Sequence, residues 1–356
     1  MWFTTFLRKS RRDREFAPWY DKARFQEALE RERARADRWE RPLSLLSLGV
    51  ADSRQGKKTL QQVARILSRR MRLTDEAGWL DHRHVGILMP NTPGWGAWTL
   101  ADEICLEFPD SVPLPQCKVY CYPSDWFQSD GDRRGNPAKT NAALEDTTEA
   151  MEPFFFQRLP RWKRAIDILG SSMFLLVHSP LLLLLAVLIR FTSRGPIYFR
   201  QIRAGLGGRP FTMFKFRTMV ENAEQLKQHL QELNEQEGPV FKIKNDPRVT
   251  WVGRYLRKFS MDEFPQMWNV LKGDMSLVGP RPPLYAEVAQ YEAWQRRRLD
   301  VTPGLTCFWQ VRGRSKISFT QWMRLDLAYI ARRSPWCDAK LLLETIPAIF
   351  VGRGAC

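Results

Sequence analysis

Histidine is scarce in this sequence, and its cysteines are scattered. Of 356 residues, only four are histidine and six are cysteine. The cysteines, at positions 105, 117, 121, 307, 337 and 356, show no paired CxxC spacing, and no histidine cluster accompanies them. A zinc site of the usual kind is therefore not expected, and reduced cytosolic thiols are the better interpretation.

A secretory signal is also missing. The first seven residues are apolar and aromatic, and basic residues come only after them, which reverses the order of a signal peptide. Residues 1–19 are set apart as an N-terminal segment, for which a frayed end is favoured over a location on a membrane surface.

Acidic residues are outnumbered by basic ones, 39 to 55, which gives a formal net charge of +16. An apolar share of 44% fits a folded protein whose surface favours anionic partners, such as nucleic acid, acidic lipid or diphosphates. No helix-turn-helix, zinc finger or RNA-binding motif accompanies the charge, so nucleic acid is not an expected partner.

The length of the chain suggests two domains. Strand and helix patterns alternate through residue 124, which predicts an α/β domain at 20–124. The predicted segments are a helix at 21–41, a strand at 43–50, a helix at 59–73, a strand at 84–90 and a helix at 97–108. A stretch rich in Asp, Gly, Asn, Pro and Thr then indicates a linker at 125–155, before a second domain at 156–356.

The second domain opens with a long apolar segment, 165–191, that has basic residues at both ends. Because cytoplasmic flanks attract Lys and Arg, both ends are expected on the cytoplasmic side, with a turn inside the membrane. Ser179 and Pro180 supply the break, since proline removes a backbone donor and serine can bond a freed carbonyl. The prediction is a re-entrant helix over about 163–192; the alternative is one kinked spanning helix.

Several motifs resemble the bacterial sugar transferase family, the monotopic phosphoglycosyl transferases. They are KRAIDI, SP, FRQIRAG, FKFRTM, the long run from FKIKNDPRVTW to LVGPRPP, and VTPGLTCFWQVRGR, in this order from about Lys163 to Ala355. The resemblance implies a helix-rich α+β membrane domain that works with Mg²⁺ through a covalent aspartyl intermediate.

Asp262 and Glu263 lie just before a predicted helix at 265–271, where the positive helix end favours an ionised carboxylate and a nearby diphosphate. The alternative is purely structural, because Ser260 and Glu263 match a capping box. The resemblance makes Asp262 the nucleophile that attacks the phosphorus bearing the sugar. It makes Glu263 the second member of a dyad, which binds metal with Asp262, positions the acceptor or acts as a base.

Basic residues in the remaining motifs are candidates for substrate binding. Arg281 stands in a stiff, donor-poor Gly-Pro-Arg-Pro-Pro backbone and is the best phosphate ligand, with a structural ion pair as the alternative. Lys215, Arg217 and Arg257 match family positions near the active site, though each could instead contact lipid headgroups. Arg314 is the expected contact to the nucleotide.

Three features beside these motifs carry weaker expectations. Cys307 stands where the family usually has glycine, which puts the local backbone angle in doubt. Residues 223–237 suggest a surface helix. The aromatic residues Trp309, Trp322, Tyr329 and Trp336 suit either a headgroup layer or a plain core.

The first domain resembles, more weakly, the diguanylate cyclase fold. The two glycines, two acids and aromatic of that family's signature are replaced by residues 81–85, DHRHV, so neither nucleotide nor magnesium can be held there. His82 and His84 are interpreted as turn residues rather than metal ligands. A non-catalytic module is expected, with homodimer formation and binding of a regulatory ligand both open.

The resemblances together imply transfer of a sugar-1-phosphate from a UDP-sugar to undecaprenyl phosphate, with release of UMP, as the first membrane step of a glycan. The expected location is the cytoplasmic face of a bacterial inner membrane, in contact with phospholipid. The rival is an inactive, membrane-tethered scaffold. The sugar is not indicated, because the motif residues address diphosphate, nucleotide and metal.

Overall fold

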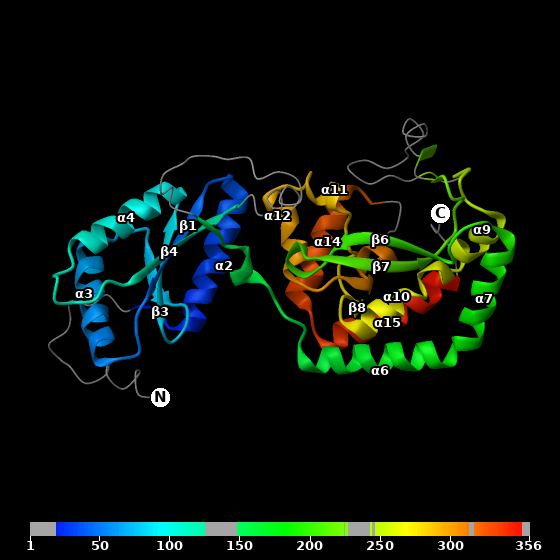
Figure 1. Ribbon diagram of the computed structural model, residues 1–356, viewed down its shortest axis with the longest axis horizontal. Coiled ribbons are helices and arrows are strands. Elements are labelled where there is room, and N and C mark those ends of the chain that lie inside the picture. The colour runs from blue at the N-terminus through cyan, green and yellow to red at the C-terminus, as the bar shows by residue number, and fades with distance from the viewer. Residues whose placement is uncertain are drawn as a thin grey trace. The chain divides into compact units, whose positions relative to one another are not determined.

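The structure is a computed structural model (Figure 1), which describes residues 19–124, 148–223, 225–226, 243, 246–312 and 317–350. The chain divides into two compact units, Met1–Phe155 and Phe156–Cys356. Each unit has its own hydrophobic core, and each is described by itself.

The first unit is built on a five-stranded sheet with the order β2-β3-β1-β4-β5. Its strands are β1 Leu43–Gly49, β2 Glu76–Trp79, β3 His84–Pro90, β4 Gln116–Tyr122 and β5 Glu149–Ala150. The strand β1 pairs antiparallel with both β3 and β4. It can take this central place because its side chains are apolar or small on both faces. The sheet is therefore mostly antiparallel, with one short parallel pair between β4 and β5.

Helices cover both faces of this sheet (Figure 1). They are α2 Lys22–Trp39, α3 Arg54–Arg70 and α4 Gly94–Leu106. On one face, α3 and α4 share a core with Leu46 and Leu48 of β1. On the other face, Phe25 of α2 lies so close to Gly78 and Gly86 that a Cβ on either glycine would clash with its ring.

The structure corrects two expectations in this unit. The helix expected from residue 59 begins at Arg54, because the Ser53 hydroxyl accepts a hydrogen bond from Gly56 N and caps an earlier first turn. Of the predicted linker, 125–147 lies outside the described residues. Its last part is not a linker: β5 pairs with β4, and Met151 and Phe155 are buried.

The second unit has a helical frame around two small sheets. Its helices are α6 Arg161–Val177, α7 Ser179–Thr192, α9 Trp251–Lys258, α10 Gln266–Lys272, α11 Tyr285–Val288, α12 Ala293–Arg296, α13 Phe308–Arg312, α14 Phe319–Arg332 and α15 Pro335–Phe350. The antiparallel hairpin is β6 Tyr198–Ala204 with β7 Pro210–Phe216, and the parallel pair is β8 Ser276–Val278 with β9 Gly304–Thr306. This unit is a mixture of helix and sheet, dominated by helix.

Helices α6 and α7 form a bent pair along the edge of this unit (Figure 1). Within the described ranges, no helix taken singly has the length and apolar character to cross a membrane, whereas these two together do, with a bend of 63° between them. At the bend, Ser179 Oγ donates to Leu176 O over 2.8 Å, and Pro180 stands in the first turn of α7. The break lies at the residues where the sequence predicts it.

The exposed and buried faces of α6 are inverted relative to those of a soluble helix. Its buried side chains are polar: Lys163, Asp167 and Ser171. Its exposed side chains are apolar, and Leu169 and Leu176 are 71% and 77% exposed. The apolar exposure continues on α7 through Leu183, Leu184, Val187, Leu188 and Phe191.

The polar face of α6 attaches it to the rest of the unit. Arg164 Nη1 and Nη2 donate to Val270 O and Leu271 O, over 2.7 and 2.6 Å, at the carboxyl end of α10. Asp167 Oδ1 accepts bonds from Ser276 Oγ and Leu277 N of β8, at 3.0 and 2.9 Å. The bent pair is thereby tied to α10 and β8.

The aromatic residues that suit either a headgroup layer or a core fall into two groups. Trp322 and Tyr329 are buried, and Tyr329 donates from its hydroxyl to Asp338 Oδ1 and Val278 O, so both belong to the core. Trp309 packs on Trp322 with ring centres 4.3 Å apart, while Trp336 is exposed. Most of the surface helix expected at 223–237 lies outside the described residues.

Candidate active site

Asp262 and Glu263 lie in a single 3-10 turn, η4 Met261–Glu263, between α9 and α10. The residue before this turn, Ser260, has a left-handed backbone with φ 54° and ψ 22°. The serine side chain makes no capping bond, so the structural alternative for this pair, a capping box, is not formed. The following helix runs from Gln266 to Lys272 and ends at Gly273 with φ 98°, one residue later than expected at each end.

Glu263 is held by a lysine from the neighbouring hairpin. Lys215 Nζ of β7 donates to Glu263 Oε1 over 2.8 Å, and both side chains are largely shielded from solvent. Asn269 fixes the spacing, because its Oδ1 accepts from Phe214 N over 3.1 Å and its Nδ2 donates to Thr212 O over 2.7 Å. A buried amide thus joins α10 to the strand that carries the lysine.

The two carboxyls of the dyad differ in charge state. Burial raises the pKa of Asp262 to about 6, with Glu263 adding to the rise, while Lys215 and Arg257 act against it. Burial also opposes the charge of Glu263, but Lys215 and Arg281 outweigh it and lower its pKa. Glu263 is therefore a firmly ionised ion-pair partner, and Asp262 is the carboxylate whose charge changes near neutral pH.

Two more of the predicted residues lie around the dyad. Arg257 Nε donates to Thr218 Oγ1 over 2.9 Å, and its charge lowers the pKa of Asp262. Arg281 follows β8, and its charge lowers the pKa of Glu263. Lys215, Arg257 and Arg281 thus surround the two carboxylates with positive charge, as an anionic diphosphate would require.

Arg217 is placed elsewhere. Its Nη2 donates to Ser193 O and Ser193 Oγ, over 2.8 and 2.7 Å, so this buried guanidinium closes the carboxyl end of α7. Its described contacts are with the bent helix pair rather than with the dyad. Arg314, the expected nucleotide contact, lies outside the described residues.

The doubt over the backbone at Cys307 is resolved. Cys307 does not have the positive φ that a required glycine would show, and its buried Sγ contacts Gln310 Oε1 at 3.2 Å. Burial raises the pKa of this thiol well above its usual value. Cysteine therefore fits here as a small, neutral core residue.

One charged residue near the dyad was missed by the sequence analysis. Arg203 of β6 is only 7% exposed, and its charge lowers the pKa of Glu263. It belongs to the FRQIRAG motif, which was recognised as a whole without singling out this arginine. Its burial could not be foreseen, because Arg200 and Arg203 point to opposite faces of one strand and the sequence does not show which face is covered; Arg200 is exposed.

The residues that flank the dyad contact the bend between α6 and α7. Phe264 packs edge-on against Phe174, with ring centres 4.9 Å apart, and Phe174 stacks on His178 at 4.1 Å. Met261 and Phe264 pack with the cluster that includes Leu185 and Ile189 of α7. The residues on either side of Asp262 and Glu263 therefore rest on the bent, apolar-faced pair.

A metal would have few protein ligands at this site. Among the residues that the structure describes, no group of three or more His, Cys, Asp or Glu is arranged to hold a metal ion. The dyad still fits Mg²⁺, which commonly binds through one or two carboxylates together with phosphate oxygens and water.

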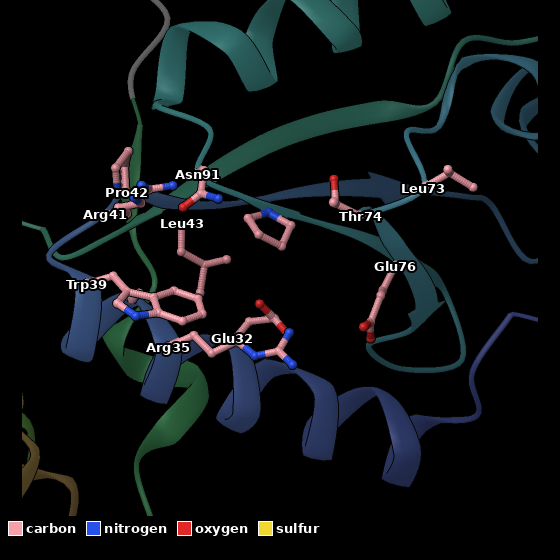
Figure 2. A pocket seen from close by; sticks show the side chains of 12 residues that line it. Glu32, Arg35, Trp39, Arg41, Pro42, Leu43, Leu73, Thr74, Glu76 and Asn91 are labelled. Atoms are coloured by element: carbon pink, nitrogen blue, oxygen red, sulfur yellow. The ribbon is translucent and has the colours of Figure 1, made fainter.

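The first unit contains a pocket of about 370 Å³ (Figure 2). Its lining comes from the carboxyl half of α2 and from the residues around Leu43, Thr74 and Asn91, and it includes none of the predicted site residues. At the hairpin between β2 and β3, His84 Nδ1 lies 2.9 Å from both carboxylate oxygens of Asp81, and His82 is exposed. His82 therefore lies in the turn, as interpreted from the sequence, whereas His84 is the first residue of β3.

The family description "Bacterial sugar transferase" matches residues 158–352, more than half of the chain. The chain belongs to the bacterial sugar transferase family. Galactosyl transferase CpsE of Streptococcus agalactiae is 44% identical over 194 residues, which cover 54% of this chain and 43% of that protein. Exopolysaccharide production protein ExoY of Rhizobium meliloti is 38% identical over 197 residues, covering 54% and 87%.

A third member of the family is the UDP-glucose:undecaprenyl-phosphate glucose-1-phosphate transferase of Caulobacter vibrioides. It is 42% identical over 197 residues, covering 52% of this chain and 69% of that one. These matches cover about half of the chain, and the chain spans less than half the length of CpsE.

The solved structures similar to this chain include diguanylate cyclase domains. One, a protein from Thermotoga maritima, covers 31% of this chain and 87% of its own, at 18% identity and a TM-score of 0.28. A second, the GGEEF domain of a diguanylate cyclase from Vibrio cholerae, has a TM-score of 0.26 at 18% identity, covering 29% of this chain and 77% of its own. Scores this low carry no argument, so the cyclase-like character of the first unit stays a resemblance.

The left-handed backbone of Ser260 predicts the outcome of two substitutions. Ser260→Val should lower the free energy of unfolding by about 1–2 kcal/mol, because a β-branched side chain is disfavoured at positive φ. The matched control Ser260→Gly should stay close to the unsubstituted protein, since glycine adopts this region freely. Thermal unfolding in detergent measures both; equal stability of the two variants would contradict the assigned backbone.

Proposed function

We propose that the chain transfers a sugar-1-phosphate from a UDP-sugar to undecaprenyl phosphate, with release of UMP. The observation that carries the proposal is one carboxylate with a pKa near neutrality, Asp262, among several fixed cations and beside an apolar-faced helix pair. The reactions named for its relatives need these features: a nucleophile, a diphosphate site and access to a lipid.

In the first step, a carboxylate oxygen of Asp262 attacks the phosphorus that carries the sugar. The bond from this phosphorus to the bridging oxygen breaks, and UMP leaves with the electron pair. In the second step, an oxygen of undecaprenyl phosphate attacks the same phosphorus, which forms the lipid diphosphate-sugar and frees the aspartate. No water enters the balance, so hydrolysis would be a side reaction.

The surrounding cations have different roles in binding. Arg281 faces the donor diphosphate, while Lys215 and Arg257 keep the two carboxylates ionised at the same time. Glu263 is already engaged by Lys215, which makes it a better orienting group than a second nucleophile. Magnesium held by the dyad and the diphosphate oxygens would neutralise charge on the leaving phosphate.

The bent pair α6–α7 is proposed as a re-entrant membrane segment with both ends at the cytoplasmic face of the bacterial inner membrane. Its buried polar side chains and exposed leucines support this, because apolar surface of that extent is unstable in water. Contact between Phe264 and the bend would then hold the dyad at the level where the prenyl phosphate headgroup lies.

Asp262→Asn should abolish the reaction, because the amide cannot form the acyl phosphate. Protein in nanodiscs is incubated with Mg²⁺, undecaprenyl phosphate and a panel of UDP-sugars, and UMP is measured. We expect acceptor-dependent release from one sugar by the unsubstituted protein and a loss of at least about a thousandfold in the variant. No release from any sugar by folded, membrane-bound protein would favour the scaffold instead.

The dependence of kcat/KM on pH should follow the ionisation of Asp262. Since the nucleophile must be charged and its pKa is about 6, kcat/KM should level off above pH 7 and fall as pH drops through 6. At pH 5 it should be about tenfold below the plateau.

Lys215→Met should move the midpoint of this limb to higher pH, because it removes a cation that lowers the pKa of both carboxyls. The control is Lys272→Met, since Lys272 is exposed and pairs with Asp274 at 3.2 Å. If the midpoint does not move when Lys215 is replaced, another group controls the pH dependence of kcat/KM.

Charges on the exposed face of α6 should weaken membrane association. The double variant Leu169→Glu, Leu176→Glu places two carboxylates on that face, each costly in hydrocarbon. Leu73→Glu with Leu106→Glu is the matched control, because these leucines of the first unit are at least as exposed. Membrane fractions washed with carbonate should retain the control and lose the variant; equal retention would count against the re-entrant segment.

A further inference from the structure

The loop that carries Arg281 is tied at both ends by backbone hydrogen bonds. Gly304 N donates to Pro280 O over 2.8 Å, and Ala204 N donates to Pro283 O over 3.0 Å. Three of the four loop residues are prolines without an N–H, so the loop depends on outside donors to satisfy its carbonyls.

The two carbonyls between these ends are bonded by arginine side chains. Arg298 Nη2 donates to Arg281 O over 2.8 Å. Arg203 Nη1 donates to Pro282 O over 3.0 Å. Every carbonyl from Pro280 to Pro283 therefore accepts one hydrogen bond, and the two at the centre are held by guanidinium groups.

Both guanidinium groups are themselves fixed. Arg298 is 2% exposed, pairs with Asp326 Oδ2 at 2.7 Å and donates from Nη1 to Tyr291 OH over 2.9 Å. Arg203 donates from Nε and Nη2 to Gln201 Oε1, over 3.0 and 2.6 Å. Neither arginine can move without breaking several bonds, so the loop backbone inherits their rigidity.

We infer that Arg203 and Arg298 are positioning residues that fix the backbone at Arg281 and so hold its guanidinium ready for an anionic ligand beside Glu263. The inference rests on the proposed function for the nature of that ligand, a nucleoside diphosphate. It adds to that function the pair of buried residues through which Arg281 is prepared for binding.

The two arginines differ in electrostatics. Asp326 pairs with Arg298 at contact distance, whereas the side chain that Arg203 bonds is the uncharged amide of Gln201, with the charges of Glu287 and Glu263 also acting on it. The charge of Arg203 therefore extends to Glu263 and Arg281, where it adds positive potential to the site. Arg298 acts through the loop alone, and Arg203 acts through the loop and through its charge.

A double-mutant cycle on the full-length protein in nanodiscs, with UDP and Mg²⁺ as the probe, tests the positioning role. Arg281→Ala should weaken UDP binding about tenfold. Arg298→Lys should weaken it about fivefold, because one ammonium cannot serve Asp326, Tyr291 and the loop carbonyl together. If Arg298 acts through Arg281, the double variant should bind no more weakly than Arg281→Ala alone.

Two results would overturn the inference: fold-changes that multiply in the double variant, or a folded Arg298→Lys protein with unchanged affinity. Arg203→Lys in the same cycle gives a second route if Arg298→Lys does not fold. Arg254→Lys, at an exposed position of α9, is the control and should leave UDP affinity unchanged.

Gln201→Glu separates charge from position. The glutamate keeps an acceptor oxygen for Arg203 but neutralises it, as Asp326 neutralises Arg298. UDP affinity should fall about threefold while thermal stability is kept. Unchanged affinity would remove the electrostatic role of Arg203.

The outcomes for this inference and for the proposed function are distinct, because UDP binding needs no acceptor. Binding that depends on Arg281 and Arg298 without UMP release from any sugar would refute the reaction and leave the positioning roles intact. UMP release by a protein whose UDP affinity does not change in Arg298→Lys would support the reaction and refute the positioning role of Arg298. Absence of UDP binding by the unsubstituted protein would overturn the inference.

Discussion

The structure of the second unit depends on the attachment of α6 through its polar face. Arg164 closes the end of α10 and Asp167 binds β8, and these two elements border the dyad and the Arg281 loop. Because buried polar groups are costly unless they are paired, the helix can be rotated in only one way, with its apolar side chains outward. The same contacts that hold the site together thus determine which apolar side chains of α6 stay exposed.

The sequence predicts much of the fold because periodicity, breakers and caps act locally. The alternation through residue 124, the break at Ser179 and Pro180, and the stop at Gly273 all appear in the structure. The departures from these expectations have different causes. Helix α3 begins early because of a local cap at Ser53. The capping-box alternative for Glu263 is not realised because Lys215, 48 residues away, offers a charge-assisted bond in a shielded place.

The sequence predicted which residues make up the candidate site but not which partners their side chains bind. Motifs indicated Asp262, Glu263, Lys215, Arg257 and Arg281, and the structure brings these together. They did not show that Arg217 binds the end of α7, because a motif that places this arginine just after β7 does not identify the partner of its side chain. Burial of Arg203 was equally hidden, since the carbonyl of Pro282, 79 residues away in the sequence, reaches its guanidinium only in the folded unit.

The fully bonded loop from Pro280 to Pro283 has a kinetic consequence. A segment whose carbonyls are all bonded has little conformational freedom left to lose, so binding of an anion there would cost little ordering free energy. An anion that binds at this edge of the site would therefore associate and dissociate without waiting for the loop to close or reopen.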